Sequence, residues 1–179
     1  RLHRMAQNLL DLARFESGQA EIRREPVNLV ELARTRVLRL APLAAEKEIE
    51  IEVQSSKPSI IVIGDETRVA QVLDNLLSNA IEHTNLGGSI TLSVHDKASG
   101  IQLCLADTGN GIPVEDLPRV FERFYRGDQS RRGSGTGLGL AIAREIIRAH
   151  GGTIQVESVV DVGTRFLIEL PTPEPTQGL

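Results

Sequence analysis

The sequence contains one cysteine, no tryptophan and few aromatic residues of any kind. The lone Cys104 cannot form an internal disulfide, which agrees with a reducing, cytoplasmic compartment. One tyrosine and four phenylalanines in 179 residues do not supply the stacking surfaces of a protein that binds single-stranded nucleic acid. The net charge of −4 leaves no general basic field for DNA or RNA. We therefore expect no nucleic-acid partner.

Long apolar runs and common hydrolytic motifs are also absent. No stretch approaches the roughly 20 apolar residues of a membrane-spanning helix, so we expect no membrane segment within this sequence. The four histidines show no metal-ligand spacing, and no G-x-S-x-G hydrolase motif occurs. Because the first residue is Arg1 rather than methionine, we expect a fragment of a longer protein whose other parts could attach it to a membrane.

The first 25 residues show a helical pattern followed by a polar stretch. Apolar residues recur at spacings of three and four, at Leu2, Met5, Leu9 and Leu12. This heptad-like seam favours a bundle helix over residues 1–18, which Gly18 would end. The alternative is a helix that packs on its own domain. Residues 19–25 are polar and charged, so we expect them to form a linker.

Residues 26–171 predict a single α+β domain. Asn28 and Asp65 are suited to begin two helices, the second ending near His83, and a third helix is expected from about Leu140. Alternating apolar residues predict strands at 49–53, 60–63, 90–94, 101–105, 154–157 and 164–170. Since strands and helices do not strictly alternate, we expect a two-layer α/β sandwich, with a mixed sheet covered by helices on one face. Residues 172–179 should form a flexible tail.

Two asparagines on the expected helix over residues 66–83 form the first candidate site. Asn75, Asn79 and Glu82 are spaced by four and three residues and therefore lie on one stripe of the helix. Asn79 could offer its carbonyl oxygen to Mg²⁺. This metal prefers oxygen ligands, and phosphates and water supply the rest of its coordination shell. Asn75 would then lie one turn away, beside the phosphates. The alternative is the solvated edge of an amphipathic helix.

A carboxylate beside two glycines forms the second candidate site. Asp107 follows a predicted strand, and Gly109 and Gly111 allow the backbone to approach a planar ligand closely. An ionised carboxylate at this point accepts a hydrogen bond from the amine of adenine, whereas the carbonyl of guanine would face it unfavourably. The alternative is an ordinary turn.

A glycine-rich segment at 133–139 leads directly into a predicted helix. The amides of a helix N-terminus suit phosphate, although the segment matches neither the phosphate-loop pattern nor G-x-G-x-x-G in a strand–turn–helix unit. The preceding segment, 125–132, is polar and carries arginines such as Arg126, which could contact phosphates. We interpret it as a lid anchored by Phe121 and Phe124; the alternative is a surface loop without function.

Together these segments resemble the catalytic and ATP-binding domain of sensor histidine kinases, within the superfamily that includes gyrase-type ATPases. The motifs are similar to the N box at 75–84, the first glycine box at 107–113, the F box at 121–126, the second glycine box at 135–140 and the last glycine-containing strand at 163–166. Residues 1–18 resemble the second helix of the family's dimerisation and histidine-phosphotransfer domain.

The resemblance implies a Bergerat-type fold that binds ATP and Mg²⁺. It implies that Asn75 and Asn79 act in catalysis, with Asn79 as the metal ligand, and that Asp107 binds adenine. The other nucleotide-binding positions that it implies are His83, Gly109, Gly111, Ile112, Phe124, Tyr125, Arg126, Gly135, Thr136, Gly137, Leu138, Gly139, Leu140 and Thr164. It further implies a homodimeric protein-histidine kinase whose phosphoryl group passes to a response regulator receiver domain.

Two departures from the family pattern leave other functions open. Glu82 stands where family members often carry a lysine or arginine that can meet phosphate, and the phosphoacceptor histidine box does not occur in this sequence. One alternative is therefore an ATP-sensing or dimerising module without kinase activity. Another is a gyrase-type ATPase, although those relatives place a glutamate that activates water where this chain has Asn75.

Overall fold

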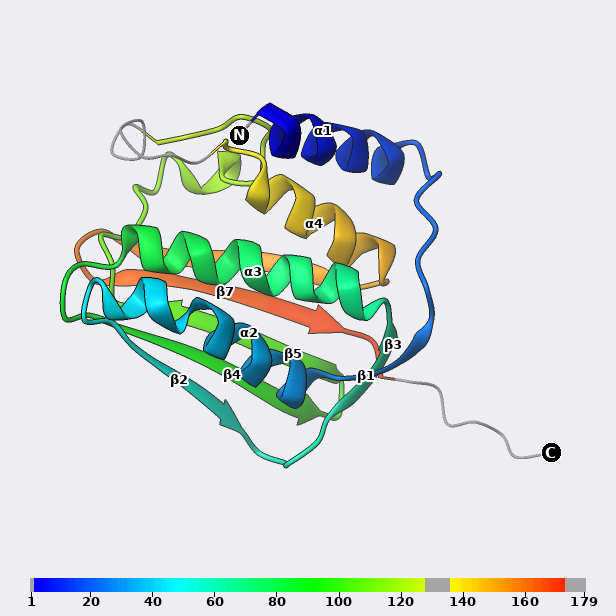
Figure 1. Ribbon diagram of the computed structural model, residues 1–179, viewed down its shortest axis with the longest axis horizontal. Coiled ribbons are helices and arrows are strands. Elements are labelled where there is room, and N and C mark those ends of the chain that lie inside the picture. The colour runs from blue at the N-terminus through cyan, green and yellow to red at the C-terminus, as the bar shows by residue number, and fades with distance from the viewer. Residues whose placement is uncertain (1, 128–135, 173–179) are drawn as a thin grey trace.

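The computed structural model describes residues 2–127 and 136–172. Its central element is a five-stranded sheet with the order β2–β4–β5–β7–β6 (Figure 1). The strands are β2 (Glu50–Ser55), β4 (Ser89–Lys97), β5 (Gly100–Asp107), β6 (Thr153–Val159) and β7 (Gly163–Leu170). β2 pairs in parallel with β4, and the other neighbours pair antiparallel, so the predicted mixed sheet is confirmed.

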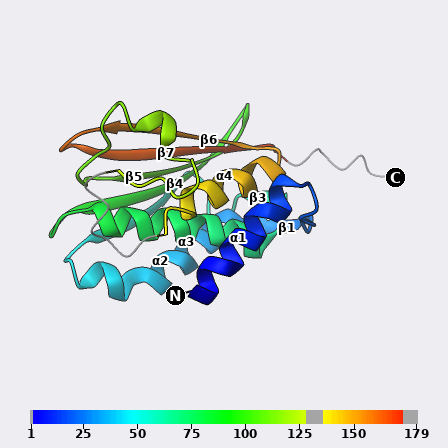
Figure 2. The same cartoon turned by 90° about the horizontal axis from the view of Figure 1, so that it is seen from above.

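Helices cover one face of this sheet (Figures 1 and 2). The helices are α1 (Leu2–Glu16), α2 (Leu29–Ala45), α3 (Glu66–His83), the short 3-10 helix η1 (Leu117–Arg119) and α4 (Gly139–Ala149). α2, α3 and α4 lie along the sheet, and α1 packs against α4. This arrangement of helices on the sheet confirms the predicted two-layer α+β architecture. Among the described helices, none combines the length and the apolar character of a membrane span.

The core lies between the helices and the sheet. Leu92, Leu105 and Phe166 are fully buried on the helix-facing side of β4, β5 and β7. From the helices, Leu73 of α3 and Ile142 of α4 meet them, also without exposure. The alternating strand residues and the 3.6-residue helical period thus converge on a single core.

Local capping explains where α2 and α3 begin. The side chain of Asn28 accepts hydrogen bonds from the amides of Val30 and Glu31 at 3.2 and 3.5 Å. Asp65 accepts from the amide of Arg68 at 3.1 Å. Both helices begin where the sequence predicted, because an N-cap side chain satisfies amides that have no partner within the helix.

A buried histidine joins the N-terminal end of α3 to the C-terminal end of α4. His150 Nε2 accepts a hydrogen bond from the amide of Asp65 at 3.0 Å, and Nδ1 lies 2.8 Å from the carbonyl oxygen of Ile146. The first contact requires Nε2 to be unprotonated, so Nδ1 carries the proton and donates it to Ile146. The ring therefore fixes how the two helices lie relative to each other.

A separate pair of strands contains one strand that the sequence predicted and one that it did not. β1 (Glu25–Asn28) pairs antiparallel with β3 (Ile61–Gly64) in a separate two-stranded sheet. The sequence predicted β3 but gave no strand over Glu25–Asn28, and the expected linker included Glu25. Pro26 and the short length obscured β1, although its Val27 is buried.

α1 packs on the domain through its last two turns. Leu12 and Phe15 are buried, with exposures of 1% and 9%, whereas Leu9 is 37% exposed. Arg68 of α3 supports this contact: its guanidinium lies 3.0 Å from the carboxylate of Asp11 and 5.3 Å from the ring centroid of Phe15. Through these residues α1 packs on its own domain, as the alternative expected, and the bundle helix over residues 1–18 stays a prediction.

The docking of α1 predicts unequal effects of two leucine substitutions. Leu12→Ala should lower the free energy of unfolding by about 2–5 kcal/mol, because it leaves a cavity between α1 and the domain. Leu10→Ala is the matched control; Leu10 is 62% exposed, and its loss should cost under about 0.5 kcal/mol. Urea unfolding of both variants measures the difference. Equal costs would show that α1 is not docked in solution.

Candidate functional site

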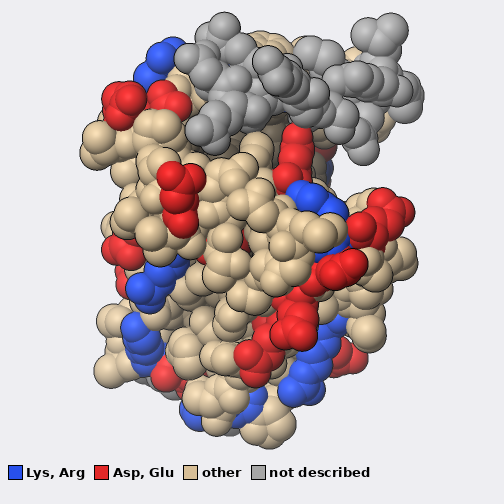
Figure 3. All heavy atoms as spheres, turned by 90° about the vertical axis from the view of Figure 1, so that its left-hand side faces the viewer, with Lys and Arg blue, Asp and Glu red and all other residues tan. Residues whose placement is uncertain are grey.

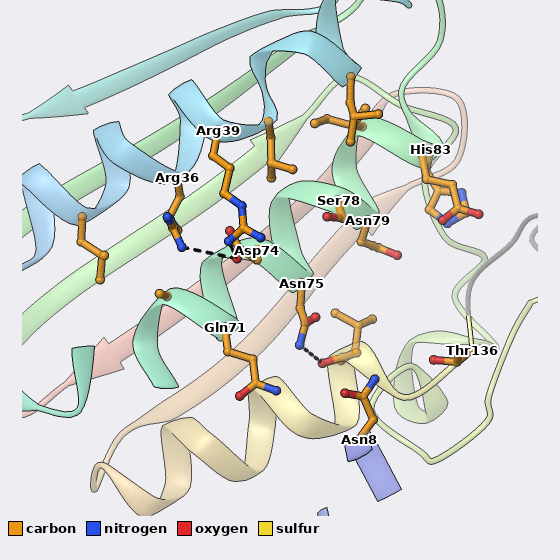
Figure 4. Close-up of a pocket in the computed structure, with 18 of the residues that line it drawn as sticks. Asn8, Arg36, Arg39, Gln71, Asp74, Asn75, Ser78, Asn79, His83 and Thr136 are labelled. Carbon is orange, nitrogen blue, oxygen red and sulfur yellow. Dashed lines mark hydrogen bonds and ion pairs between the residues drawn. The ribbon is translucent and has the colours of Figure 1, made fainter. Parts of the chain in front are cut away.

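A cavity of about 1280 Å³ lies between α2, α3 and the segment that leads into α4 (Figure 4). Its volume exceeds the roughly 300–1,000 Å³ of typical small-molecule pockets. The predicted site residues that line it are Asn75, Asn79, His83, Tyr125, Arg126, Thr136, Gly137, Gly139 and Leu140. The structure thus brings the amides of α3 together with the described part of the second glycine segment. Gly135, predicted to belong to the same segment, lies outside the described residues.

Asn75 and Asn79 project from one side of α3, and Thr136 lies on the segment opposite them (Figure 4). Asn79 is half-buried and borders the cavity. The side-chain amide of Asn75 donates a hydrogen bond to the carbonyl oxygen of Gly139 at 3.1 Å. Asn75 therefore connects α3 to the first residue of α4, a role that its position on the predicted stripe did not reveal.

α4 begins without a capping side chain. Leu138 is the N-cap residue, and its side chain is buried and cannot accept a hydrogen bond from the first-turn amides. The amides of a first turn have no partner within the helix and carry the positive end of its dipole. Because Gly137 and Gly139 line the cavity at this point, these features favour an anionic ligand.

The backbone of Gly137 packs against that of Phe124. Gly137 has a φ of +69°, and a Cβ there would lie 2.7 Å from the carbonyl carbon of Phe124. The amide of Phe124 donates to the carbonyl oxygen of Gly137 at 2.9 Å. This contact joins the two ends of the predicted lid, of which residues 128–132 lie outside the described ranges.

Only one of the two phenylalanines expected to anchor that segment packs inside the protein. Phe121 packs edge-on against Phe166, with 6.3 Å between the ring centroids. Phe124 is 51% exposed and has a φ of +60°, so its ring does not pack inside the protein. Residue 124 is held by the contact between its backbone and Gly137, and the exposed ring of Phe124 does not hold it.

Asp107 lies buried at the end of β5. Its Oδ1 accepts hydrogen bonds from the amides of Gly109 at 2.9 Å and Thr164 at 3.2 Å. Burial raises the pKa of the Asp107 carboxyl above its ordinary value, against the lowering effect of these hydrogen bonds and of His83. No hydrogen bond to Oδ2 is found among the described residues, so this oxygen could accept one from a ligand.

The first glycine segment connects Asp107 to the end of α3. The amide of Asn110 donates to the carbonyl oxygen of His83 at 3.2 Å. A Cβ on Gly109 would lie only 2.5 Å from that same oxygen, so glycine is needed there. Gly111 has a φ of +70°, and a Cβ there would lie 2.2 Å from the carbonyl oxygen of Val159. The first glycine segment is therefore adjacent to His83, which lies on the same helix as Asn79, the predicted metal ligand.

The cavity does not extend along all the predicted residues. Those that do not line it are Asp107, Gly109, Gly111, Ile112, Phe124, Leu138 and Thr164. Most of them belong instead to a hydrogen-bonded group beside it, in which Ser158 Oγ accepts from the amide of Ile112 at 2.8 Å and lies 2.9 Å from Thr164 Oγ1. The predicted site thus divides into a part that lines the cavity and a neighbouring buried part.

Several lining residues were not found by sequence reasoning. Arg39 and Arg36 of α2 lie 3.0 and 3.6 Å from the carboxylate of Asp74 on α3. Lys47, in the turn after α2, reaches the last turn of α3. All three basic residues lie in α2 or just after it, where charged residues are common on any exposed surface, so no local pattern distinguishes them.

Charges of both signs surround this end of the molecule. Figure 3 shows the side that includes the C-terminal end of α3, where acidic and basic side chains are interspersed. Within residues 2–127 and 136–172, no group of three or more His, Cys, Asp and Glu side chains is placed to hold a metal ion. Mg²⁺ whose coordination shell consists mainly of phosphate oxygens and water needs no such group.

The chain is similar to known proteins over most of its length. The sequence model of the histidine kinase-, DNA gyrase B-, and HSP90-like ATPases matches residues 64–174. Sensor histidine kinase WalK of Bacillus subtilis (strain 168) is 35% identical over 178 residues, a match that covers 97% of this chain and 29% of that protein. The chain spans 29% to 45% of the length of the first curated relatives it matches.

Solved structures of histidine kinases share the fold. The catalytic domain of histidine kinase ThkA has a TM-score of 0.75 and 32% identity, covering 86% of this chain and 97% of that one. Full-length ShkA in complex with AMPPNP has a TM-score of 0.85 and 32% identity, covering 95% and 35%. ThkA in complex with the response regulator protein TrrA has a TM-score of 0.75 and 26% identity, covering 96% and 49%. The predicted fold class is confirmed.

The raised pKa of Asp107 predicts a pH-dependent effect of Asp107→Asn on the unliganded protein. The folded state binds the proton more tightly than the unfolded state, so wild-type stability falls as pH rises from about 4 through the native pKa of Asp107. The variant lacks this dependence, and its stability relative to the wild type should rise over that window and then stay constant. Urea unfolding across the pH range measures the difference.

Asp161→Asn is the matched control for this experiment, because Asp161 is exposed in the turn between β6 and β7. Its difference from the wild type should show no comparable rise. If Asp107→Asn instead lost stability relative to the wild type as pH rose, burial would not be the dominant influence on Asp107.

Proposed function

The chain belongs to the histidine kinase-, DNA gyrase B-, and HSP90-like ATPase family, and on that basis we propose that it is the ATP-binding catalytic domain of a protein-histidine kinase in a two-component system. One observation carries the proposal: Asn75 and Asn79 of α3 share a cavity with Gly137 and Gly139 at the start of α4. Amide side chains that face an uncapped helix N-terminus favour a metal–polyphosphate ligand.

ATP would extend from the Asp107 region into this cavity. Asp107 would accept a hydrogen bond from the adenine amine through Oδ2, while Oδ1 stays bonded to Gly109 and Thr164. The phosphates would lie near the first turn of α4, with Tyr125 and Arg126 at the cavity wall. The hydrogen bond between Asn110 and His83 makes the two ends of the site adjacent and supports one continuous nucleotide.

The residues present suit Mg²⁺ as the metal. Asn79 offers one neutral oxygen ligand beside the expected phosphates, and Mg²⁺ in nucleotide sites commonly takes only one or two protein ligands. When bound, Mg²⁺ would neutralise negative charge on the phosphate oxygens. Asn79 would orient the metal, and the α4 amides would hold the phosphates. Glu82 is exposed at the cavity edge and would repel phosphate, so it does not take the place of a basic residue there.

The chemistry would be phosphoryl transfer to an imidazole. A nitrogen of the acceptor histidine attacks the γ-phosphorus, a P–N bond forms, the bond to the bridging oxygen breaks, and ADP leaves. Such reactions depend on positioning and charge neutralisation more than on covalent participation by the enzyme. Asn75 cannot act as a base for water, because its amide donates to Gly139 and has no basic nitrogen. Slow hydrolysis is therefore expected.

The proposed partners are proteins as well as ATP. The acceptor histidine would lie on the first helix of a dimerisation and phosphotransfer domain, to which α1 would contribute the second helix, within a homodimer. Receiver domains of response regulators would then take the phosphoryl group. The complex of the ThkA histidine kinase with the response regulator protein TrrA supports a response regulator as a partner. We place this part of the protein in the cytoplasm.

Transfer of radiolabel tests the proposed activity. The purified chain should transfer phosphate from γ-labelled ATP to a separately supplied bundle domain that carries the acceptor helix of the full-length protein. The label should be lost when that histidine is replaced by glutamine. Bound ATP without transfer would favour the ATP-sensing alternative, and rapid release of labelled phosphate would favour a gyrase-type ATPase.

Two substitutions should separate the adenine end of the site from its metal end. Asp107→Asn should weaken ATP binding about 10- to 100-fold whether or not Mg²⁺ is present, because it removes a charged hydrogen-bond acceptor. Asn79→Ala should remove chiefly the gain in affinity that Mg²⁺ provides. Calorimetric titrations of ATP with Mg²⁺ and with EDTA measure both. Equal losses under the two conditions for Asn79→Ala would exclude Asn79 as the metal ligand.

Exposed Ser78, next to Asn79 on α3, offers a control on the same helix. Ser78→Ala should change ATP affinity less than twofold under either condition. A large loss in this variant would show that truncating any side chain along α3 disturbs binding, and the metal assignment would fail.

A further inference from the structure

Lys47 binds the C-terminal end of the helix that carries both asparagines. Its Nζ lies 2.7 Å from the carbonyl oxygen of Ile81, 3.0 Å from that of Glu82 and 2.6 Å from that of Thr84. A lysine ammonium has three N–H donors, and here each has an acceptor. The side chain lines the cavity, but its hydrogen-bonding capacity is used by the protein itself.

These three carbonyls are groups that a helix cannot satisfy by itself. The last four carbonyls of an α-helix lack partners within it, and a cation near them is favoured by the helix dipole. The remaining carbonyl of this segment, that of His83, accepts from the amide of Asn110. Lys47 and the first glycine segment together therefore satisfy the end of α3.

Backbone hydrogen bonds between the turn after α2 and the loop after α3 hold Lys47 in place. Its carbonyl oxygen accepts a hydrogen bond from the amide of Gly87 at 3.0 Å. The amide of Glu50, at the start of β2, donates to the carbonyl of Gly88 at 3.1 Å. The turn after α2 is thus bonded to the loop after α3 through both backbone and side chain.

His83 lies within the last turn of α3, which this arrangement fixes, and Asn79 immediately precedes that turn. The amide of Thr84 donates to the carbonyl of Ala80, so the closed last turn begins at the residue after Asn79. On the other side, Gly109 packs so tightly on the His83 carbonyl that no side chain would fit. A small displacement of this turn would move Asn79 relative to the α4 amides.

We propose that Lys47 is a positioning residue of the nucleotide site, which holds the last turn of α3 so that Asn79 meets the metal-bound phosphates. The proposal rests on the function proposed above. Lys47 acts through α3 and does not contact phosphate. Its loss should therefore resemble the loss of a group that supports a metal ligand, which typically lowers affinity or activity 10- to 100-fold.

Three variants test this role: Lys47→Met, Lys47→Arg and the control Lys57→Met. Lys57 pairs with Asp96 at an exposed position that does not line the cavity. ATP affinity is measured by calorimetry with Mg²⁺ and with EDTA. Lys47→Met should lose at least about tenfold in Mg-ATP affinity and much less in EDTA. Lys47→Arg, which can still donate to the carbonyls, should recover part of this loss, and Lys57→Met should bind like the wild type.

Hydrogen exchange in the absence of nucleotide provides a second readout. In Lys47→Met, the amides of Thr84 and Asn110 should exchange faster, whereas those in the middle of α4 should keep their protection. If Lys47→Met does not fold, Lys47→Gln, which retains a shorter donor, takes its place in both measurements.

The outcomes separate this proposal from the proposed function. If the wild type does not bind ATP, the proposed function fails. If the wild type binds, three results would each overturn the role of Lys47: unchanged Mg-ATP affinity in Lys47→Met, equal losses with and without Mg²⁺, or unchanged exchange at Thr84 and Asn110. Equal losses would indicate a direct contact between Lys47 and phosphate.

Discussion

The placement of α3 on the sheet is the constraint on which the rest of the site depends. Its apolar side is buried against β5 and the neighbouring helices α2 and α4, and separate polar contacts fix its two ends. At the N-terminal end, the amide of Asp65 donates to the buried ring of His150. At the C-terminal end, Lys47 and Asn110 satisfy the carbonyls. Hydrophobic burial is non-directional, and these directional bonds add to the packing by fixing the position of α3 along its axis.

Asp107 shows how the site departs from what stability alone would favour. A buried carboxylate is costly unless its hydrogen bonds are satisfied, and the raised pKa indicates that the amides of Gly109 and Thr164 do not fully offset the burial. A ligand that donates to the remaining oxygen would offset more of this cost. The same burial that destabilises the empty protein would strengthen binding, because a hydrogen bond is worth more in a site from which water is excluded.

Sequence reasoning succeeded where short-range physics decides the structure. Asn28 and Asp65 begin their helices through bonds to residues two or three positions away, so their role can be seen in the sequence itself. It could not decide where distant segments matter: Leu9 and Leu12 both fit the helical seam, and of these two only Leu12 is buried, where α1 packs against the domain and α4. Lys47 left no pattern, because its partners lie 34 to 37 residues further along the chain. The motifs predicted the candidate site residues, and tertiary contacts decide which of them line the cavity.

Asn75 has both a structural role and a consequence for the chemistry of the site. Its amide donates to the carbonyl oxygen of Gly139 and thereby joins α3 to the first turn of α4. A glutamate here, as in the gyrase-type relatives, would place an acceptor near another acceptor, since an ionised carboxylate has no proton to donate. The start of α4 would then have to move, or the carboxylate would turn toward the cavity and a water molecule. In the proposed function, the same amide that holds α4 would provide no base for water, and the phosphoryl group would remain for a nucleophile supplied by another part of the protein.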